Sequence, residues 1–176
     1  MMHWYNVSNH DQFLVAYRAI RRDVERFALF VERDRDNASD LLHNALVSAI
    51  RAWGRIGDAP SLKSYLISSI LRMHRRAQKR APRFDYPDMD SLIAADALSP
   101  EAAADMRLVR DAIAMLPDAE RISFVLAEIE GWPLADIAEE LGLGLSAVKM
   151  RVKRGRDRII AMFQEHPIVD GEHTDV

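Results

Sequence analysis

The stretch from Leu116 to Phe163, LPDAERISFVLAEIEGWPLADIAEELGLGLSAVKMRVKRGRDRIIAMF, decides the fold class. Two short segments with the apolar spacing of helices, ADIAEEL and SAVKMRVKR, are separated by a few residues that include Gly142 and Gly144. The second segment begins a run of cations: Lys149, Arg151, Lys153, Arg154, Arg156 and Arg158. Two short helices joined by a tight turn, with the second helix basic, are typical of a helix-turn-helix that places a recognition helix in the DNA major groove.

Positive charge is concentrated in two places. Residues 72–83 hold six cations and no acid, and residues 149–158 hold six cations and one acid. Because the two runs carry +11 and the chain as a whole carries −3, the other residues carry −14. Two cationic runs on an otherwise acidic chain indicate a polyanion partner, although a single run is often only a solvated helix face.

The N-terminal part of the chain is predicted to form three helices. The first begins at Ser8 and ends near Val31, the second ends at Gly54, and the third opens at Ser61 and ends at Pro82. The apolar residues expected to face inward are Phe13, Tyr17, Ile20, Val24, Phe27 and Val31, then Leu41, Leu42, Ala45, Leu46, Ala49, Ile50 and Trp53, then Leu62, Tyr65, Leu66, Ile70 and Met73. These helices predict a first domain over residues 8–82.

A change of composition follows, which predicts a flexible linker over residues 83–98. Ser99-Pro100-Glu101 is a strong helix start, and the helix that follows is expected to bury Met106, Val109, Ile113 and Leu116. A second domain over residues 99–163 would contain the helix-turn-helix, and residues 164–176 are expected to be a disordered tail. The predicted fold class is all-α, with two small helical domains joined by a flexible linker.

Several classes of function are not expected. The chain has no cysteine, and its six histidines show no ligand spacing, so neither a disulfide nor a metal site is predicted. It has no P-loop, paired-carboxylate site or nucleophile motif, so we expect neither an enzyme nor a cofactor. The N-terminus lacks the pattern of a signal peptide, and no apolar stretch is long enough to cross a bilayer, so we expect a cytoplasmic protein without membrane insertion.

The spacing of the C-terminal residues resembles a known pattern, LP…R…F…G…IA…LG…VK.R..R. The matching residues are Leu116-Pro117, Arg121, Phe124, Gly131, Ile137-Ala138, Leu141-Gly142, Val148-Lys149, Arg151 and Arg154. The chain resembles the RNA polymerase sigma factors of the extracytoplasmic-function class of the sigma-70 family. A weaker match, to D.AEDLVQETFLRAW, comes from Asp36, Ala38, Asp40, Leu41 and Ala49, and Leu66 matches a later leucine. His43-Asn44, Ile50 and Tyr65 depart from the usual residues of the family.

The resemblance implies a promoter-specific initiation factor that binds core RNA polymerase, double-stranded promoter DNA and the melted non-template strand. An anti-sigma factor is a further candidate partner. Polymerase binding is expected at Asp40 and Asn44. Minus-35 recognition is expected from Lys149, Met150, Arg151, Lys153 and Arg154, and contacts in the minus-10 region from Tyr65, Arg72, Arg75, Arg76 and Lys79. His74 is a second candidate, beside Tyr65, for stacking on an extruded base, with a core position as the alternative for the tyrosine.

Two details of the recognition helix are also expected. Gly144 would cap its N-terminus, so that backbone amides approach a phosphate. Val148 and Val152 would face the core together with Ile137 and Leu141, while Arg151 either holds phosphate or supports the domain.

Two other classes of function fit parts of the sequence. A stand-alone helix-turn-helix regulator would explain the C-terminal half and leave the N-terminal helices as a ligand-binding or dimerisation domain. A helical adaptor would use the cationic runs to bind an acidic protein. Binding to core polymerase would distinguish a sigma factor from the stand-alone regulator. Failure to bind promoter-sized DNA would favour the adaptor.

Overall fold

The computed structural model describes residues 7–32, 34–78 and 100–165. Within these residues all regular structure is helical, in seven α-helices and one π-helical turn, which confirms the all-α prediction. The chain divides into two compact units, unit 1 within residues 1–94 and unit 2 within residues 95–176. The predicted linker, Lys79 and the tail from residue 166 lie outside the described residues. No helix in the described ranges is long and apolar enough to cross a membrane.

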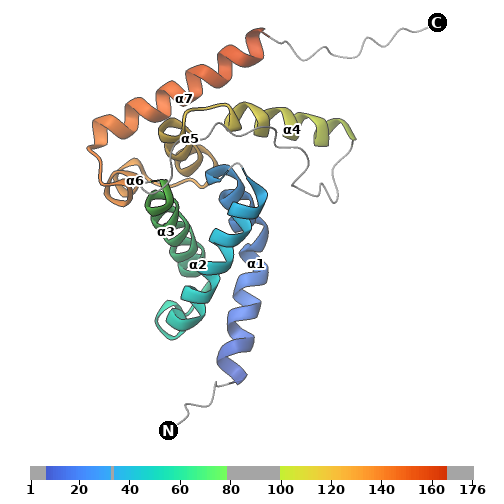
Figure 1. Ribbon diagram of the computed structural model, residues 1–176, viewed down its shortest axis with the longest axis vertical. Helices are drawn as coiled ribbons and strands as arrows, with labels where there is room; N and C mark the ends of the chain where they lie inside the picture. Colours follow the sequence, from blue (N-terminus) through green and yellow to red (C-terminus); the bar gives the residue numbers. More distant parts are fainter. Residues whose placement is uncertain (1–6, 33, 79–99, 166–176) are drawn as a thin grey trace, which may run out of the picture. The chain divides into compact units, whose positions relative to one another are not determined.

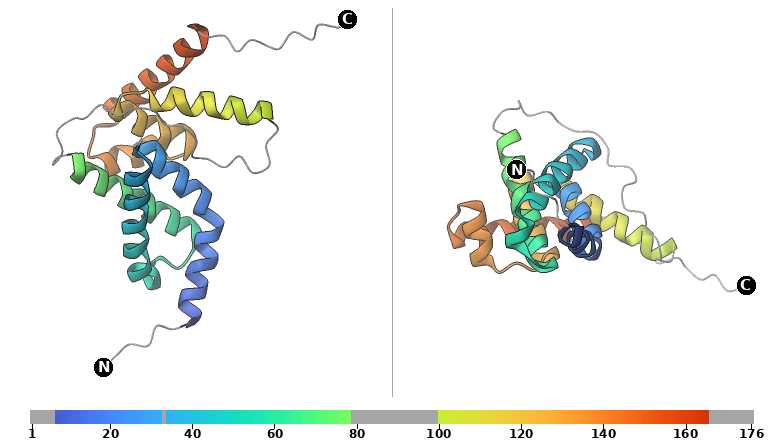
Figure 2. Two further views of the ribbon diagram at one scale, coloured as in Figure 1. Left: turned by 45° about the vertical axis from the view of Figure 1, so that its right-hand side comes forward. Right: turned by 90° about the horizontal axis from the view of Figure 1, so that it is seen from below.

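Unit 1 is a bundle of three helices, α1 (Val7–Val31), α2 (Arg35–Ile56) and α3 (Ala59–Gln78), each of which contacts the other two (Figures 1 and 2). The apolar stripe predicted on α1 is buried, apart from Tyr17, which is half-buried at its edge. The ring of Phe13 meets Trp53 of α2 edge-on, with ring centroids 5.4 Å apart. The first helix of the sequence prediction is therefore confirmed in both extent and orientation.

The buried face of α2 differs in part from the prediction. Ala38, Ala45, Ala49, Ala52 and Trp53 are buried, whereas Leu41, Leu42, Leu46 and Ile50 are only half-buried. The alanines recur at steps of seven, four and three, so they form one narrow line along the helix. Small side chains on that line let α2 approach α1 and α3 closely, and the larger residues flank the contact instead of filling it.

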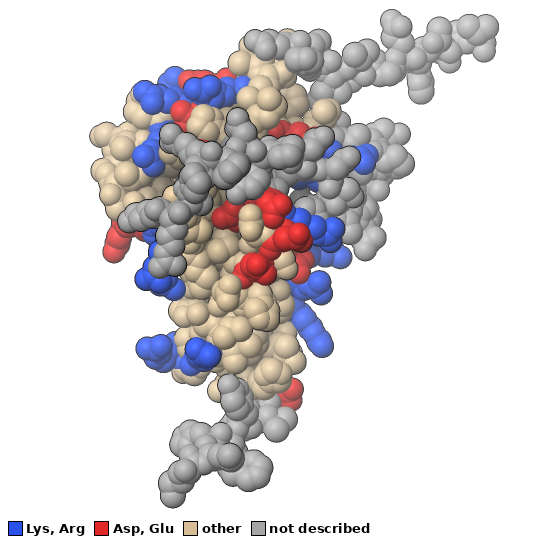
Figure 3. All heavy atoms as spheres, in the orientation of Figure 1, with Lys and Arg blue, Asp and Glu red and all other residues tan. Residues whose placement is uncertain are grey.

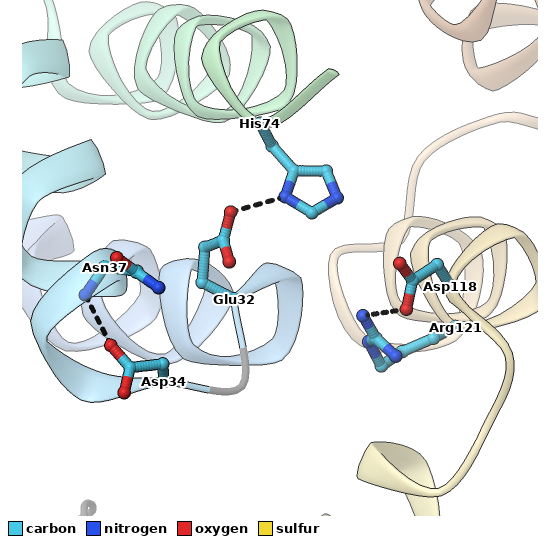
Figure 4. Close-up of polar contacts among 6 residues, drawn as sticks. All are labelled: Glu32, Asp34, Asn37, His74, Asp118 and Arg121. Carbon is cyan, nitrogen blue, oxygen red and sulfur yellow. Dashed lines mark hydrogen bonds and ion pairs between the residues drawn. The ribbon is translucent and has the colours of Figure 1, made fainter. Parts of the chain in front are cut away.

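The start of α3 lies two residues before the predicted one. Asp58 is the capping residue, because its carboxylate accepts hydrogen bonds from the Ser61 amide at 2.8 Å and from the Ser61 hydroxyl at 2.9 Å. Ser61 therefore lies inside the first turn and does not open the helix, contrary to the sequence prediction. Asp34 does the same for α2, accepting from the Asn37 amide at 2.8 Å (Figure 4).

His74 is part of the core of unit 1. Its Nδ1 lies 2.6 Å from Oε1 of Glu32, and only 3% of the histidine side chain and 12% of the glutamate side chain are exposed (Figure 4). The contact joins the last turns of α3 to the residue that follows α1. Stacking of His74 on an extruded base, which the sequence left open, is not compatible with this burial.

Unit 2 contains α4 (Pro100–Ala114), α5 (Asp118–Phe124), a π-helical turn η1 (Val125–Ile129), α6 (Leu134–Leu141) and α7 (Leu145–Glu165). Helix α7 contacts α4, α5 and α6, so it is the central element of the unit. The predicted start at Pro100 is confirmed, and α7 continues two residues beyond the predicted end at Phe163. Val109 was expected in the core but is 38% exposed, because α4 packs on the unit through Ala112 and Ile113 one turn later.

The turn between α4 and α5 is held by a buried arginine. The guanidinium of Arg121 donates to the carboxylate of Asp118 at 2.8 Å (Figure 4). It also donates to the backbone oxygen of Leu116 at 3.0 Å. Only 2% of Arg121 is exposed. An arginine at this depth requires partners for its charge and its N–H groups, and the turn supplies them.

Candidate nucleic-acid interface

Helices α6 and α7 form the predicted helix-turn-helix. Gly142 ends α6 with a φ of 65°, a left-handed conformation that glycine adopts without steric cost. The amide of Leu143 then donates to the backbone oxygen of Ala138 at 2.9 Å. The carbonyl of Gly144 accepts from the amides of Ala147 and Val148 at 3.0 and 3.2 Å, so Gly144 stands at the N-terminus of α7 as the sequence predicted.

Helix α7 has a buried face and an outward face. Val148, Val152 and Gly155 form the buried face, against α5 and α6. Because the side chains of a helix advance by 100° per residue, burial of this line turns the opposite line of residues to solvent. We call these residues the outward face: Lys149, Met150, Lys153, Arg154 and Asp157, all of which are exposed.

The five predicted minus-35 residues lie on the outward face of α7 or at its flank. Four of them lie on the outward face, and Arg151 is half-buried at its flank. Figure 3 shows blue side chains gathered over α7, in agreement with the cation run of the sequence. The buried position of Val148, Val152 and Ile137 is also as expected, while Leu141 is half-buried.

Some cations of α7 have an ion-pair partner in the described residues, and others have none. Nζ of Lys153 lies 2.7 Å from the carboxylate of Asp157 on the same helix. Arg156 lies 2.6 Å from Glu128 of η1, and Arg158 lies 2.9 Å from Glu120 of α5. Within the described ranges, Lys149 and Arg154 have no ion-pair partner. The sequence shows only the sign of these charges, and the structure shows which of them are already neutralised by acids of the same unit.

Gly155 permits the close approach of α7 to α5. A Cβ atom built on Gly155 would lie 3.2 Å from the Cβ of Phe124 and 3.5 Å from Cδ1 of Leu116. The first distance is tighter than ordinary van der Waals contact. A glycine in the interior of a helix costs about 1 kcal/mol relative to alanine, so its presence in the middle of α7 has a packing reason. The sequence analysis did not predict a packing role for Gly155, although an isolated glycine inside a basic helix indicates one.

The candidate minus-10 residues lie on α3. Tyr65, Arg72 and Arg76 follow one another at steps of seven and four, so they share one face of the helix. Arg72 and Arg76 are exposed, and the guanidinium of Arg72 donates to the Ser69 hydroxyl at 3.2 Å. Tyr65 is half-buried, with its hydroxyl 3.5 Å from the backbone oxygen of Ser48. Arg75 is half-buried beside this face.

The candidate polymerase-binding residues lie on α2. Asp40 and Asn44 are both exposed, one helical turn apart. The side-chain amide of Asn44 donates to the backbone oxygen of Asp40 at 2.8 Å, so Asn44 folds back on its own helix and leaves the Asp40 carboxylate as the charged group. Figure 3 shows acidic side chains gathered over the start of α2, where Asp36 is exposed as well.

Comparison with known proteins matches both units to one family. Sigma-70 region 2 matches residues 16–84, and sigma-70 region 4 matches residues 106–159. The chain is 29% identical over 151 residues to the ECF RNA polymerase sigma factor SigM of Mycobacterium tuberculosis, covering 84% of this chain and 74% of that protein. It is 27% identical over 159 residues to the ECF RNA polymerase sigma factor EcfG of Rhodopseudomonas palustris, covering 89% and 85%. The chain is a sigma-70 family sigma factor of the extracytoplasmic-function class.

A solved structure agrees with this fold. The sigma factor RpoE of Bartonella quintana, determined in complex with the anti-sigma factor NepR, superposes with a TM-score of 0.65 at 20% sequence identity. The match covers 88% of this sigma factor and 96% of that chain. At this level of identity the likeness concerns the fold alone.

The residues that identify the family are mostly structural in this sigma factor. Leu116, Arg121 and Phe124 are buried, and Gly131 and Gly142 have positive φ angles of 69° and 65°. Ile137, Ala138 and Val148 are buried as well. These residues set the path of the chain around α7, and of the outward face only Lys149 and Arg154 belong to the family pattern.

We expect Gly155→Val to destabilise this sigma factor by about 1–3 kcal/mol, because the added methyl groups would overpack the contact with Phe124. Chemical denaturation measures the change. Ala161→Val introduces the same final side chain at an exposed position of α7 and should change the free energy of unfolding by less. Equal stability of Gly155→Val and the wild type would show that α7 does not depend on this close approach.

Proposed function

We propose that this sigma factor binds core RNA polymerase and directs it to a subset of promoters, with one recognition task in each unit. The observation that carries the proposal is the outward face of α7, a cationic surface that a buried apolar line holds in place on a helix-turn-helix. The matches to regions 2 and 4, in this order along the chain, support the assignment. A stand-alone regulator would give no reason for the region 2 match over residues 16–84.

For the second domain, residues 99–163, we propose recognition of the minus-35 element. Arg154 and Lys149 are exposed without an ion-pair partner in the described residues, so they are the cations most available to DNA. A guanidinium can bind guanine O6 and N7 with two hydrogen bonds, and a lysine serves either a base or a phosphate. Met150, 48% exposed between them, offers apolar contact to a base edge. Arg151 at the flank suits a phosphate contact.

For the first domain, residues 8–82, we propose contacts with the minus-10 region. Arg72 and Arg76 on the shared face of α3 would neutralise phosphates of the melted non-template strand, with Arg75 beside them. Lys79, outside the described residues, is proposed for the same task from its place in the cation run of the sequence. Tyr65 lies on the same face, and its half-buried ring is a candidate surface for stacking of an unpaired base. Residues 83–98 would serve as the linker between the domains.

Core polymerase is proposed to bind the polar side of α2. Asp40 presents a carboxylate there, and Asn44 stabilises the local geometry through its bond to the Asp40 carbonyl. An exposed acidic side chain suits a partner surface that is basic. Sigma factors are in general regulatory proteins without enzymatic activity, and we propose none for this chain.

Its place of action would be the cytoplasm, where the polymerase is found. An anti-sigma factor is proposed as a further partner, since the similar protein of Bartonella quintana was solved with one.

Run-off transcription tests the proposed function. Core polymerase with this sigma factor should produce discrete transcripts from a subset of a genomic promoter library, and core polymerase alone should not. Promoters selected in this way define the minus-35 sequence for all later measurements. Absence of sigma-dependent transcripts, with the protein folded and bound to promoter DNA, would favour the stand-alone regulator.

The double variant Asp40→Lys, Asn44→Lys should weaken the complex with core polymerase, because it reverses the charge of the proposed contact. Binding measured by size-exclusion chromatography and by competition with the wild type checks this. Asp11→Lys with Gln12→Lys changes the net charge equally at exposed positions of α1 and serves as the matched control. Wild-type affinity of the α2 variant would place the polymerase contact on another surface.

A further inference from the structure

Asp157 is the one acid in the cationic run of residues 149–158, and it lies on the outward face of α7. Its carboxylate oxygen is 2.7 Å from Nζ of Lys153, one helical turn earlier. The two side chains are 56% and 68% exposed, so the pair is formed at the surface, among the groups assigned to DNA. Nothing in the helix-turn-helix pattern requires an acid at this position.

The Lys153–Asp157 pair differs from the other ion pairs of α7. Arg156 and Arg158 reach Glu128 and Glu120 on other elements of the unit, so those pairs help to hold α7 in place. Lys153 and Asp157 belong to the same helix and connect it to nothing else. Removal of this pair should therefore leave the packing of the unit unchanged, and a role in DNA binding can be separated from a role in folding.

We propose that Asp157 limits the affinity of this sigma factor for DNA by holding Lys153 in an ion pair that opens when a phosphate takes its place. The inference rests on the proposed function of the outward face. Asp157 would then be a negative determinant: it competes with phosphate for Lys153, and its own charge repels the DNA backbone. Because phosphate contacts carry no sequence information, the acid lowers affinity for every sequence.

The strength of the pair is in the range that such a competition requires. An exposed ion pair one turn apart on a helix changes an equilibrium constant by about two-fold. The order, with lysine before the acid, is also less favourable than the reverse order with respect to the helix dipole. Lys153 is thus restrained in the free protein but is released at small cost when α7 docks on DNA.

The test compares Asp157→Asn with two controls in the full-length chain bound to core polymerase. Asp157→Glu keeps an acid within reach of Lys153 and should behave as the wild type. Asp111→Asn removes an acid of equal exposure, 55% against 56%, that pairs with Arg110 on α4. Affinity is measured by fluorescence anisotropy at several salt concentrations. The probes are a promoter selected by run-off transcription and the same duplex with its minus-35 region scrambled.

We expect Asp157→Asn to bind both duplexes at least about two-fold more tightly than the wild type, with neither control doing so. Because Lys153 reaches the phosphate in both proteins, the slope of log affinity against log salt should stay close to that of the wild type. In a Lys153→Ala background the gain in affinity should shrink. Thermal denaturation should show little change for the variants at Asp157 and Lys153, whose pair is exposed.

Failure of the proposed minus-35 recognition and failure of the inference about Asp157 give different results. A wild-type complex that does not prefer the promoter duplex over the scrambled one would contradict the proposed minus-35 recognition itself. A wild type that discriminates, together with an Asp157→Asn variant of unchanged or lower affinity, would overturn the inference about Asp157 alone. A gain that persists in full in the Lys153→Ala background would overturn the ion-pair competition.

Discussion

The packing of α7 through Val148, Val152 and Gly155 is the constraint on which the rest of unit 2 depends. This buried line fixes the rotation of the helix about its own axis, and the rotation alone decides which cations meet solvent. Gly155 allows α7 to come within close contact of Phe124 and Leu116, and the pairs of Arg156 and Arg158 hold its middle against η1 and α5. The proposed recognition of DNA by the outward face would thus be a consequence of apolar burial on the opposite side of the helix.

In unit 1, too, the burial of apolar residues decides which polar side chains are exposed. The line of alanines on α2 brings three long helices together, and burial of their apolar faces leaves Tyr65, Arg72 and Arg76 on one side of α3 and Asp40 on the polar side of α2. The contact between His74 and Glu32 ties the basic end of α3 to the end of α1. A polar pair at this depth is costly unless both partners are satisfied, so it favours a single arrangement of the helix ends.

Sequence reasoning predicted what depends on local periodicity. The stripe on α1, the helix-turn-helix and the buried valines of α7 repeat every three or four residues, so they are visible without a structure. The cap at Asp58, the exposure of Val109 and the burial of His74 were missed because they depend on neighbours distant in the chain or on the end of a helix. For the same reason the sequence showed the cations of α7 but not their partners, since Arg156 and Glu128 are 28 residues apart.

The most direct measurement of the central claim compares Arg154→Ala with Arg156→Ala in the complex with core polymerase. Each variant removes one cation from α7, but Arg154 lies on the outward face and Arg156 is paired with Glu128. Arg154→Ala should reduce discrimination between the selected promoter and its scrambled minus-35 form by about 1–3 kcal/mol. Arg156→Ala should leave that discrimination unchanged. Wild-type discrimination by a folded Arg154→Ala variant would contradict the claim that the outward face of α7 reads the promoter.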